Sequence, residues 1–399
     1  MTQPEQSATV TRPLGQDVTA NPSAPHGVAA DSLSEHWRTV YDARRPLASK
    51  PFRSVCYAPF TTLEFTVNGE VVACWRSASY VLGRIGEETL DEIWRGPKIA
   101  ALREVLKQYR FLDSCRWCQW QIQTGDVTGV QANRYDFLDV DADAQWPKQF
   151  YFSIDSTCNF ACIMCCGDVS STFRVRIDGL PPKPPIYTDA FFEQLDPYLP
   201  RLQAACFFGG EPFLGRGNYR IWDRMIALKA KATLHINTNG SVFNERVRHY
   251  LDALNIGTIA VSVDGFTKET FERVRRFGNF EQVLANTEAF AAYCRERGKH
   301  FSLAVCLLRQ NYQELPRLYE LTERLGGFVS LNLVTNPAEY SVYALPEPER
   351  LHIRDYLEQA FRGMEQNLSQ ANQLSFRGMI DTLSGSSKED ITNAGSNDA

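Results

Sequence analysis

The sequence predicts an α/β protein, and three observations lead to that prediction. Strand-like and helix-like runs alternate between about residues 148 and 333, which is the pattern of parallel βα units. Ahead of them, two β-rich runs flank Asn68-Gly69, a strong signal for a β-hairpin. The chain is also long enough for sizeable cores, because 44% of its 399 residues are hydrophobic.

Six βα units are expected in the C-terminal part. The strands are predicted at residues 150–155, 204–208, 234–237, 258–263, 301–307 and 328–333. Helices fit between them, at residues 188–199, 244–254, 267–276, 280–297 and 315–325. An amphipathic helix near residues 351–364 follows the last strand.

The N-terminal part is expected to hold a small hairpin-plus-helix unit. The hairpin strands are residues 61–67 and 70–73, and a helical stretch follows at about 90–108. The turn would bring two thiols toward one site, and a CXXC knuckle presents two more. This set consists of Cys56, Cys74, Cys115 and Cys118. Four thiols make a closed site, for which zinc is the simplest occupant.

A second cysteine set follows the strand at residues 150–155, in the loop where α/β barrels place their sites. Its members, at CX3CX2C spacing, are Cys158, Cys162 and Cys165. Three thiolates ligate only three irons of a four-iron cluster, so the fourth iron stays open to a reactive ligand. The alternative is that these thiols are buried hydrophobes. Cys166 is adjacent to Cys165 and is left out of the ligand set.

This cysteine spacing resembles the signature of the radical S-adenosylmethionine (radical SAM) superfamily, and Met164 matches the bulky residue usual there. The resemblance covers about residues 52–340 and implies a partial (β/α)6 barrel. It also implies a [4Fe–4S] cluster whose open iron is chelated by SAM. The reduced cluster of that family cleaves SAM to a 5′-deoxyadenosyl radical.

The resemblance further implies where SAM is held. Gly209-Gly210-Glu211 matches the GGE motif, whose backbone and carboxylate hold the methionine ammonium. The implied SAM contacts are Gly209, Gly210, Glu211, Asn237, Ser262, Asp264 and Arg275. The alternative is a plain turn for the first four, a helix cap for Ser262 and Asp264, and a solvated helix face for Arg275.

The first cysteine set resembles the twitch domain, a shortened relative of the SPASM domain, with its pattern CX9–15GX4C followed by CX2C. Thr124 stands where a full SPASM domain would have its next cysteine. One auxiliary [4Fe–4S] cluster is therefore implied, with zinc as the alternative. The module usually follows the barrel, whereas here it precedes it.

The predicted organisation has six parts. They are a disordered segment at 1–35, the auxiliary domain at 50–122, a linker at 123–147, the barrel at 148–340, a helical segment at 341–383 and a disordered tail at 384–399.

Composition limits the partners. A net charge of −5 gives no general attraction to nucleic acid or to anionic membranes. No apolar run has the length of a membrane span and no signal-peptide core is present, so a cytoplasmic location is expected. The chain has eleven cysteines, and in such a protein a set of this size points to metal ligands rather than disulfides. Cys206, Cys294 and Cys306 sit in apolar runs and are expected in the core.

The predicted function is hydrogen abstraction from a peptide substrate, with the auxiliary cluster aiding oxidation. An external one-electron reductant such as flavodoxin or ferredoxin would be needed. The alternatives are a dehydrogenase or epimerase of a carbohydrate or aminocyclitol, and a non-enzymatic iron–sulfur or zinc scaffold.

Overall fold

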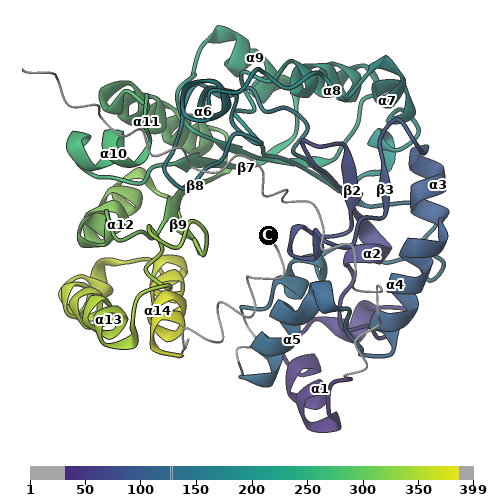
Figure 1. The fold of residues 1–399 in the computed structure, drawn as a ribbon, viewed down its shortest axis with the longest axis horizontal. Coiled ribbons are helices and arrows are strands. Elements are labelled where there is room, and N and C mark those ends of the chain that lie inside the picture. The colour runs from purple at the N-terminus through teal and green to yellow at the C-terminus, as the bar shows by residue number, and fades with distance from the viewer. Residues whose placement is uncertain (1–31, 126, 128, 386–399) are drawn as a thin grey trace, which may run out of the picture.

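The computed structural model describes residues 32–125, 127 and 129–385. They form one nine-stranded sheet in the order β3-β2-β1-β4-β5-β6-β7-β8-β9. Figure 1 shows this sheet curving around the centre of the molecule, with helices on its outer side. The segments predicted to be disordered are residues 1–35 and 384–399, and of these residues 1–31 and 386–399 lie outside the described residues. Residues 32–35 are described, and there the Leu33 N–H donates to the Tyr109 carbonyl at 3.0 Å.

All six predicted strands of the barrel are confirmed and pair in parallel. They are β4 (Gln149–Phe152), β5 (Ala204–Phe207), β6 (Thr233–Thr238), β7 (Ile256–Ser262), β8 (His300–Cys306) and β9 (Phe328–Asn332). The helices after the cysteine-bearing loop are α6 (Ser171–Arg176), α7 (Asp189–Gln194), α8 (Arg216–Ala227), α9 (Glu245–Ala253), α10 (Lys268–Val274), α11 (Phe280–Glu296) and α12 (Leu315–Leu325). The partial barrel of βα units is therefore present.

Capping residues explain where several of these helices begin and end. The side chains of Asn244, Thr267 and Asn279 accept hydrogen bonds from the first turns of α9, α10 and α11. Gly326, at φ +75°, ends α12 in the left-handed conformation that glycine adopts without strain.

The predicted hairpin is confirmed, but it is not a separate sheet. Strands β1 (Thr62–Phe65) and β2 (Glu70–Val72) meet at a turn in which Gly69 has φ +77°. Strand β1 also pairs in parallel with β4, from Thr62 opposite Gln149 to Phe65 opposite Phe152. The hairpin and β3 (Gly83–Arg84) thus extend the barrel sheet at one edge. No local pattern in the sequence predicts this continuity.

Short helices complete the N-terminal part. They are α1 (Glu35–Asp42), α2 (Ala58–Thr61), α3 (Leu90–Arg95), α4 (Pro97–Lys107) and α5 (Arg116–Gln123). The predicted helix at 90–108 is confirmed with a break at Gly96, before Pro97. Residues expected as a linker include a 3-10 turn (Gln131–Tyr135). Asp136 accepts two hydrogen bonds from the buried Arg45 guanidinium at 2.7 and 2.8 Å, which fixes this segment to the N-terminal helices.

The C-terminal helices cover the free edge of the sheet at β9. They are α13 (Glu347–Arg362) and α14 (Gln370–Gly385). The Val329 N–H donates to Asn372 Oδ1 at 2.7 Å, and Ser375 Oγ donates to the Val329 carbonyl at 2.7 Å. Side chains of α14 therefore satisfy backbone groups that an edge strand would leave open.

The two faces of the sheet differ in burial. On the outer face, Phe65 packs against Phe152 and against Phe191 of α7. Residues that point the other way along β4 and β6, such as Tyr151, His235 and Asn237, are only partly buried. The inner face of the barrel is thus polar and partly buried along β4 and β6, whereas helices lie along the outer face (Figure 1).

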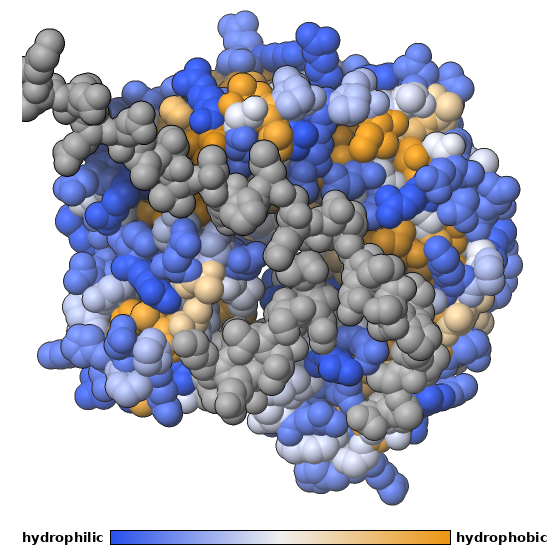
Figure 2. Space-filling model, in the orientation of Figure 1, coloured by the Kyte–Doolittle hydropathy of each residue, from blue (hydrophilic) through white to orange (hydrophobic). Residues whose placement is uncertain are grey.

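The outer surface shows hydrophobic residues in separate areas among hydrophilic ones, in the view of Figure 2. The large exposed hydrophobic side chains, such as Trp75, Phe137 and Leu374, come from different elements. Within the described residues, no helix combines the length and the apolar character that a membrane span requires.

Candidate metal centres

Three thiols lie in the loop between β4 and α6, which we call the cysteine loop: Cys158, Cys162 and Cys165. The backbone of this loop is fixed to the end of α10. The Ala161 N–H donates to the Arg276 carbonyl at 3.0 Å, and the Ile163 N–H donates to the Val274 carbonyl at 2.9 Å. The start of the loop is held by Thr172, whose hydroxyl donates to the Cys158 carbonyl at 2.6 Å. The thiols are therefore presented by a well-supported backbone.

Polar side chains contact two of these thiols. Asn239 Nδ2 lies 3.7 Å from Cys158 Sγ, and Arg275 Nη1 lies 3.9 Å from Cys162 Sγ. Burial raises the pKa of all three thiols, that of Cys162 to about 11. Such thiols ionise readily only when a cationic group binds them, so the donor set suits a metal cluster.

The predicted GGE turn packs directly against the cysteine loop. Gly209 has φ +90°, and a Cβ on it would lie 3.0 Å from Ser153 Oγ. A Cβ on Gly210 would lie only 2.3 Å from the Thr157 carbonyl oxygen. The two glycines are thus required for the close approach of the turn to the chain just ahead of Cys158.

The Glu211 carboxylate is buried and already accepts three hydrogen bonds. Its donors are the Phe213 N–H at 3.0 Å, the Thr238 hydroxyl at 2.7 Å and the Asn239 N–H at 2.6 Å. Burial is the main cause that raises the pKa of Glu211 to about 6. This side chain therefore joins the ends of β5 and β6 and positions Asn239. Its contact with a methionine ammonium stays a prediction.

Two other predicted SAM contacts form an ion pair. Asp264 is fully buried, and its Oδ2 lies 2.7 Å from Arg275 Nη2. Asp264 Oδ1 also accepts the Cys306 N–H at 2.6 Å. The pair places the Arg275 guanidinium against the cysteine loop, beside Cys162.

The last two predicted contacts are neighbours on the inner face. Ser262 Oγ donates to Asn237 Oδ1 at 3.1 Å. All the predicted SAM residues thus lie at the carboxyl ends of β5, β6 and β7 or, for Arg275, at the end of α10. Contact of these residues with SAM stays a prediction.

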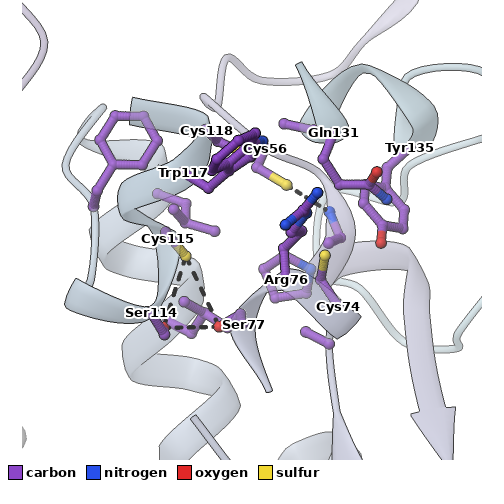
Figure 3. Close-up of a pocket in the computed structure, with 17 residues that line it drawn as sticks. Cys56, Cys74, Arg76, Ser77, Ser114, Cys115, Trp117, Cys118, Gln131 and Tyr135 are labelled. Atoms are coloured by element: carbon purple, nitrogen blue, oxygen red, sulfur yellow. Dashed lines mark hydrogen bonds between the residues drawn. The ribbon is translucent and has the colours of Figure 1, made fainter. Parts of the chain in front are cut away.

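The second cysteine set lines one cavity, which we call the auxiliary pocket (Figure 3). Cys56 precedes α2, Cys74 follows β2, and the knuckle lies at the start of α5. The empty volume of the pocket is about 480 Å³, part of it open to solvent. The four thiols that face it are Cys56, Cys74, Cys115 and Cys118.

The thiols of the auxiliary pocket are suited to a metal group. Burial raises the pKa of Cys56, Cys74 and Cys118, that of Cys74 to about 12. Cys115 Sγ lies 3.9 Å from Ser77 Oγ, which in turn lies 2.8 Å from Ser114 Oγ. In the described part of the chain, no three His, Cys, Asp or Glu side chains are grouped as ligands of a single metal ion. Instead, the four thiols surround a cavity, which suits a larger group such as an iron–sulfur cluster.

Several residues near the two sites were missed by the sequence analysis. Gln131 and Tyr135, from the predicted linker, line the auxiliary pocket, and Arg76 lies over the Trp75 and Trp117 rings beside it. Glu64 points to the inner face of the barrel, and burial raises its pKa to about 7. Among these residues, only Glu64 could have been found from the sequence. It lies between Leu63 and Phe65 in a predicted strand, so its side chain is expected on the face opposite to theirs.

Comparisons with known proteins match both parts of the chain. Residues 153–322 match the radical SAM superfamily, and residues 56–119 match SPASM, an iron–sulfur cluster-binding domain. A GTP 3′,8-cyclase of Saccharophagus degradans is 27% identical over 137 residues, which are 34% of this chain and 39% of the relative. An S-adenosylmethionine-dependent nucleotide dehydratase, RSAD2, of Danio rerio is 22% identical over 246 residues, 58% of this chain and 62% of the relative.

Solved structures are also similar, at lower identity. SuiB of Streptococcus suis bound to the precursor peptide SuiA is 12% identical, with a TM-score of 0.40 over 65% of this chain and 61% of that one. Native anSMEcpe with bound AdoMet is 16% identical, with a TM-score of 0.41 over 55% and 61%. The chain spans 39% to 62% of the length of the curated relatives named above.

The two family matches coincide with the two cysteine sites. The SPASM match begins at Cys56 and ends just after Cys118, and the radical SAM match contains the cysteine loop. A [4Fe–4S] cluster and SAM are the cofactors of the first family, and iron–sulfur ligation is the property of the second. The chain therefore contains a radical SAM domain and, N-terminal to it, an iron–sulfur cluster-binding domain of the SPASM type.

Proposed function

We propose that the protein is a radical SAM enzyme that abstracts hydrogen from a peptide substrate and uses its auxiliary cluster for net oxidation. The observation that carries this proposal is the placement of the cysteine loop. It lies at the carboxyl ends of the parallel strands, directly above a polar and partly buried inner face. Sites of α/β barrels are built at this end of the sheet.

The cysteine loop would hold the cluster that binds SAM through its open iron. When bound and reduced, this pair supplies a 5′-deoxyadenosyl radical able to take hydrogen from an unactivated carbon. The chain's own task is positioning. Arg275 and Asn239 contact the thiols of the loop, and Glu211 fixes Asn239 through its backbone N–H. Gly209 and Gly210 let the end of β5 approach the loop closely enough to border the same site.

The auxiliary pocket would hold the second cluster by all four of its thiols. A closed ligand set leaves no iron open for substrate, which favours electron acceptance over direct substrate binding. The pocket is joined to the barrel through the hairpin, since β1 pairs with β4. An external one-electron reductant such as flavodoxin or ferredoxin would supply the cluster of the cysteine loop, and a cytoplasmic location stays a prediction.

A peptide is the proposed substrate because of the extent of the inner face. From β1 to β8 this face crosses five strand spacings, or roughly 24 Å along the sheet. An extended peptide of about seven residues spans that length. The names of the two curated relatives given above concern nucleotides, and each of these two is matched over less than two thirds of its length.

Oxidation or epimerisation of a carbohydrate or aminocyclitol is the second candidate. The polar side chains of the inner face, among them Glu64, Tyr151 and His235, favour it, because such substrates carry many hydrogen-bonding groups.

The test is reductive SAM cleavage by the full chain after anaerobic reconstitution with iron and sulfide. With dithionite and SAM, 5′-deoxyadenosine should form, and a variant with alanine at all three positions of the cysteine loop should form none. A wild-type protein that holds its iron and forms no 5′-deoxyadenosine would contradict the proposal and favour a non-enzymatic scaffold. Transfer of deuterium from labelled candidate peptides or sugars into 5′-deoxyadenosine would then identify the substrate class.

A further inference from the structure

Four side chains form a row across the inner face of the barrel, which we call the inner row: Glu64, Tyr151, Cys206 and His235. The register of the sheet fixes the row, because each residue is paired with the next on the neighbouring strand. Neighbouring strands are about 4.8 Å apart, so adjacent members of the row are within reach of one ligand. Asp155, whose carbonyl accepts the Gly210 N–H, lies four positions after Tyr151 in the chain. The row therefore lies roughly 13 Å from the GGE turn, measured along the strand.

Glu64 is the member of the row that has a buried polar atom without a hydrogen-bond partner among the described residues. This atom is Oε2 of its carboxyl group. The backbone N–H of Trp75 lowers the pKa of this carboxyl, but burial raises it more. Arg134 is a cation near the row, and it lowers the pKa of Tyr151. It does not donate a hydrogen bond to Glu64 Oε2, which has no donor within the described residues.

A buried acceptor without a donor is costly, so a ligand that donates a hydrogen bond to Glu64 Oε2 would be stabilised there. Glu64 is also placed between the two cysteine sites. It pairs across the hairpin with Val72, two residues before Cys74, and on its other side with Tyr151 of the barrel. A ligand on Glu64 would thus lie between the auxiliary pocket and the cysteine loop.

We propose that Glu64 binds a protonated amine of the substrate and so anchors it across the inner row. A carboxylate whose partners include no cation selects a charged donor over a neutral one, because hydrogen bonds between charged groups are the stronger ones. The aromatic pair formed by Tyr151 and Phe208, whose ring centroids are 5.6 Å apart, offers an apolar wall for the carbon chain beside the amine. This inference rests on the proposed function, since it names the chemistry of the same substrate.

The test measures binding of two ammonium probes to the reconstituted full chain by ligand-observed NMR and titration calorimetry. One probe is an end-blocked Ala-Lys-Ala peptide, and its neutral match carries norleucine in place of lysine. The other probe is glucosamine, and its neutral match is glucose. The two arms separate a peptide amine from a sugar amine as the source of the bound group.

The expected result is that at least one ammonium probe binds more tightly than its neutral match. Glu64→Gln should weaken that binding roughly ten- to a hundred-fold, the loss of one hydrogen bond between charged groups. Glu193→Gln, which removes an exposed carboxylate of α7, should leave it unchanged. Failure of both ammonium probes to bind at millimolar concentration, or binding that is insensitive to Glu64→Gln, overturns the proposal.

Thermal unfolding of the substrate-free protein gives a second measurement. If Glu64 is kept for a ligand, Glu64→Gln should preserve or raise the midpoint, because it removes a buried charge that lacks a partner. A large fall, or a variant that fails to fold, would show a structural role and would also overturn the proposal. SAM cleavage by the wild type without amine binding refutes only this inference. Amine binding without cleavage refutes only the proposed function.

Discussion

Replacing Glu211 by alanine is predicted to weaken both the fold and the binding of SAM. The carboxylate accepts hydrogen bonds from Phe213, Thr238 and Asn239, and the side chain is only 1% exposed. After the substitution, two backbone N–H groups and one hydroxyl lose their acceptor at the place where the ends of β5 and β6 meet. Asn239, which contacts the thiol of Cys158, would lose its fixed position.

The magnitude follows from those contacts. A buried donor left without an acceptor costs about 1–3 kcal/mol, and three donors lose their acceptor here. We expect a total loss of about 3 kcal/mol, near the lower end of that sum, because water can enter the space left by the side chain and satisfy part of the lost bonds. The affinity for SAM should fall roughly ten- to a hundred-fold, as for the loss of one hydrogen bond to a charged group.

The assay is urea unfolding of the full chain, together with calorimetric titration of SAM into reconstituted protein. Glu323→Ala is the matched control. The Glu323 carboxylate also accepts three hydrogen bonds, from the Ser369 N–H, the Ser369 hydroxyl and Asn372 Nδ2, at 2.6 to 2.7 Å. This network lies between α12 and α14, away from the cysteine loop. The control should therefore lose stability and keep its affinity for SAM.

Thr238→Val separates two roles of Glu211. If the carboxylate acts by positioning the end of β6, loss of the Thr238 hydroxyl should weaken SAM binding as well. If the carboxylate holds the methionine ammonium directly, the valine variant should bind SAM almost as the wild type does. An alanine variant of Glu211 with unchanged stability and unchanged affinity would refute the reasoning for both roles.

Three further predictions concern the metal sites and Glu64. Reconstituted protein should hold about eight irons, and the triple-alanine variant of the cysteine loop roughly half of them; four irons with one tightly held zinc would refute the auxiliary cluster. Alanine at Cys115 and Cys118 should leave SAM cleavage measurable and reduce product formation far more; a folded variant with wild-type turnover would make the auxiliary cluster architectural. Burial raises the pKa of Glu64 from 4.5 to about 7, so its folded-state carboxyl binds a proton more readily than the unfolded one. As the pH falls from about 8 to about 5, metal-free wild type should therefore gain up to about 3 kcal/mol of stability over Glu64→Gln; parallel urea-unfolding profiles would contradict this.

The elements of the barrel could be predicted because their signals are local. Each parallel strand is a short apolar run, and the helices between them begin at capping residues such as Asn244 and Asn279. The hairpin turn was equally readable, since Asn68-Gly69 suits a position that needs a positive φ. Both cysteine sets could be predicted from their spacing, because spacing is also a local feature of the sequence.

The roles of single polar residues were harder to predict. Glu211, Asp264 and Arg275 were expected to face SAM, and in the structure each also makes buried contacts with other parts of the chain. Those contacts join residues that are 11 to 42 positions apart. No local pattern encodes them, because they depend on the register of neighbouring strands.

The sequence by itself determined the order of strands and helices, the two cysteine sites and the glycines of the GGE turn, because all of these depend on neighbouring residues in the chain. Only the tertiary structure decided that the hairpin joins the barrel sheet through β1 and β4. That pairing brings Glu64 onto the inner face, next to Tyr151. On its other side Glu64 lies opposite Val72, two residues before Cys74. Parallel pairing between segments more than 80 residues apart is a non-local choice, set by which edges and hydrophobic faces remain to be buried once the local elements have formed.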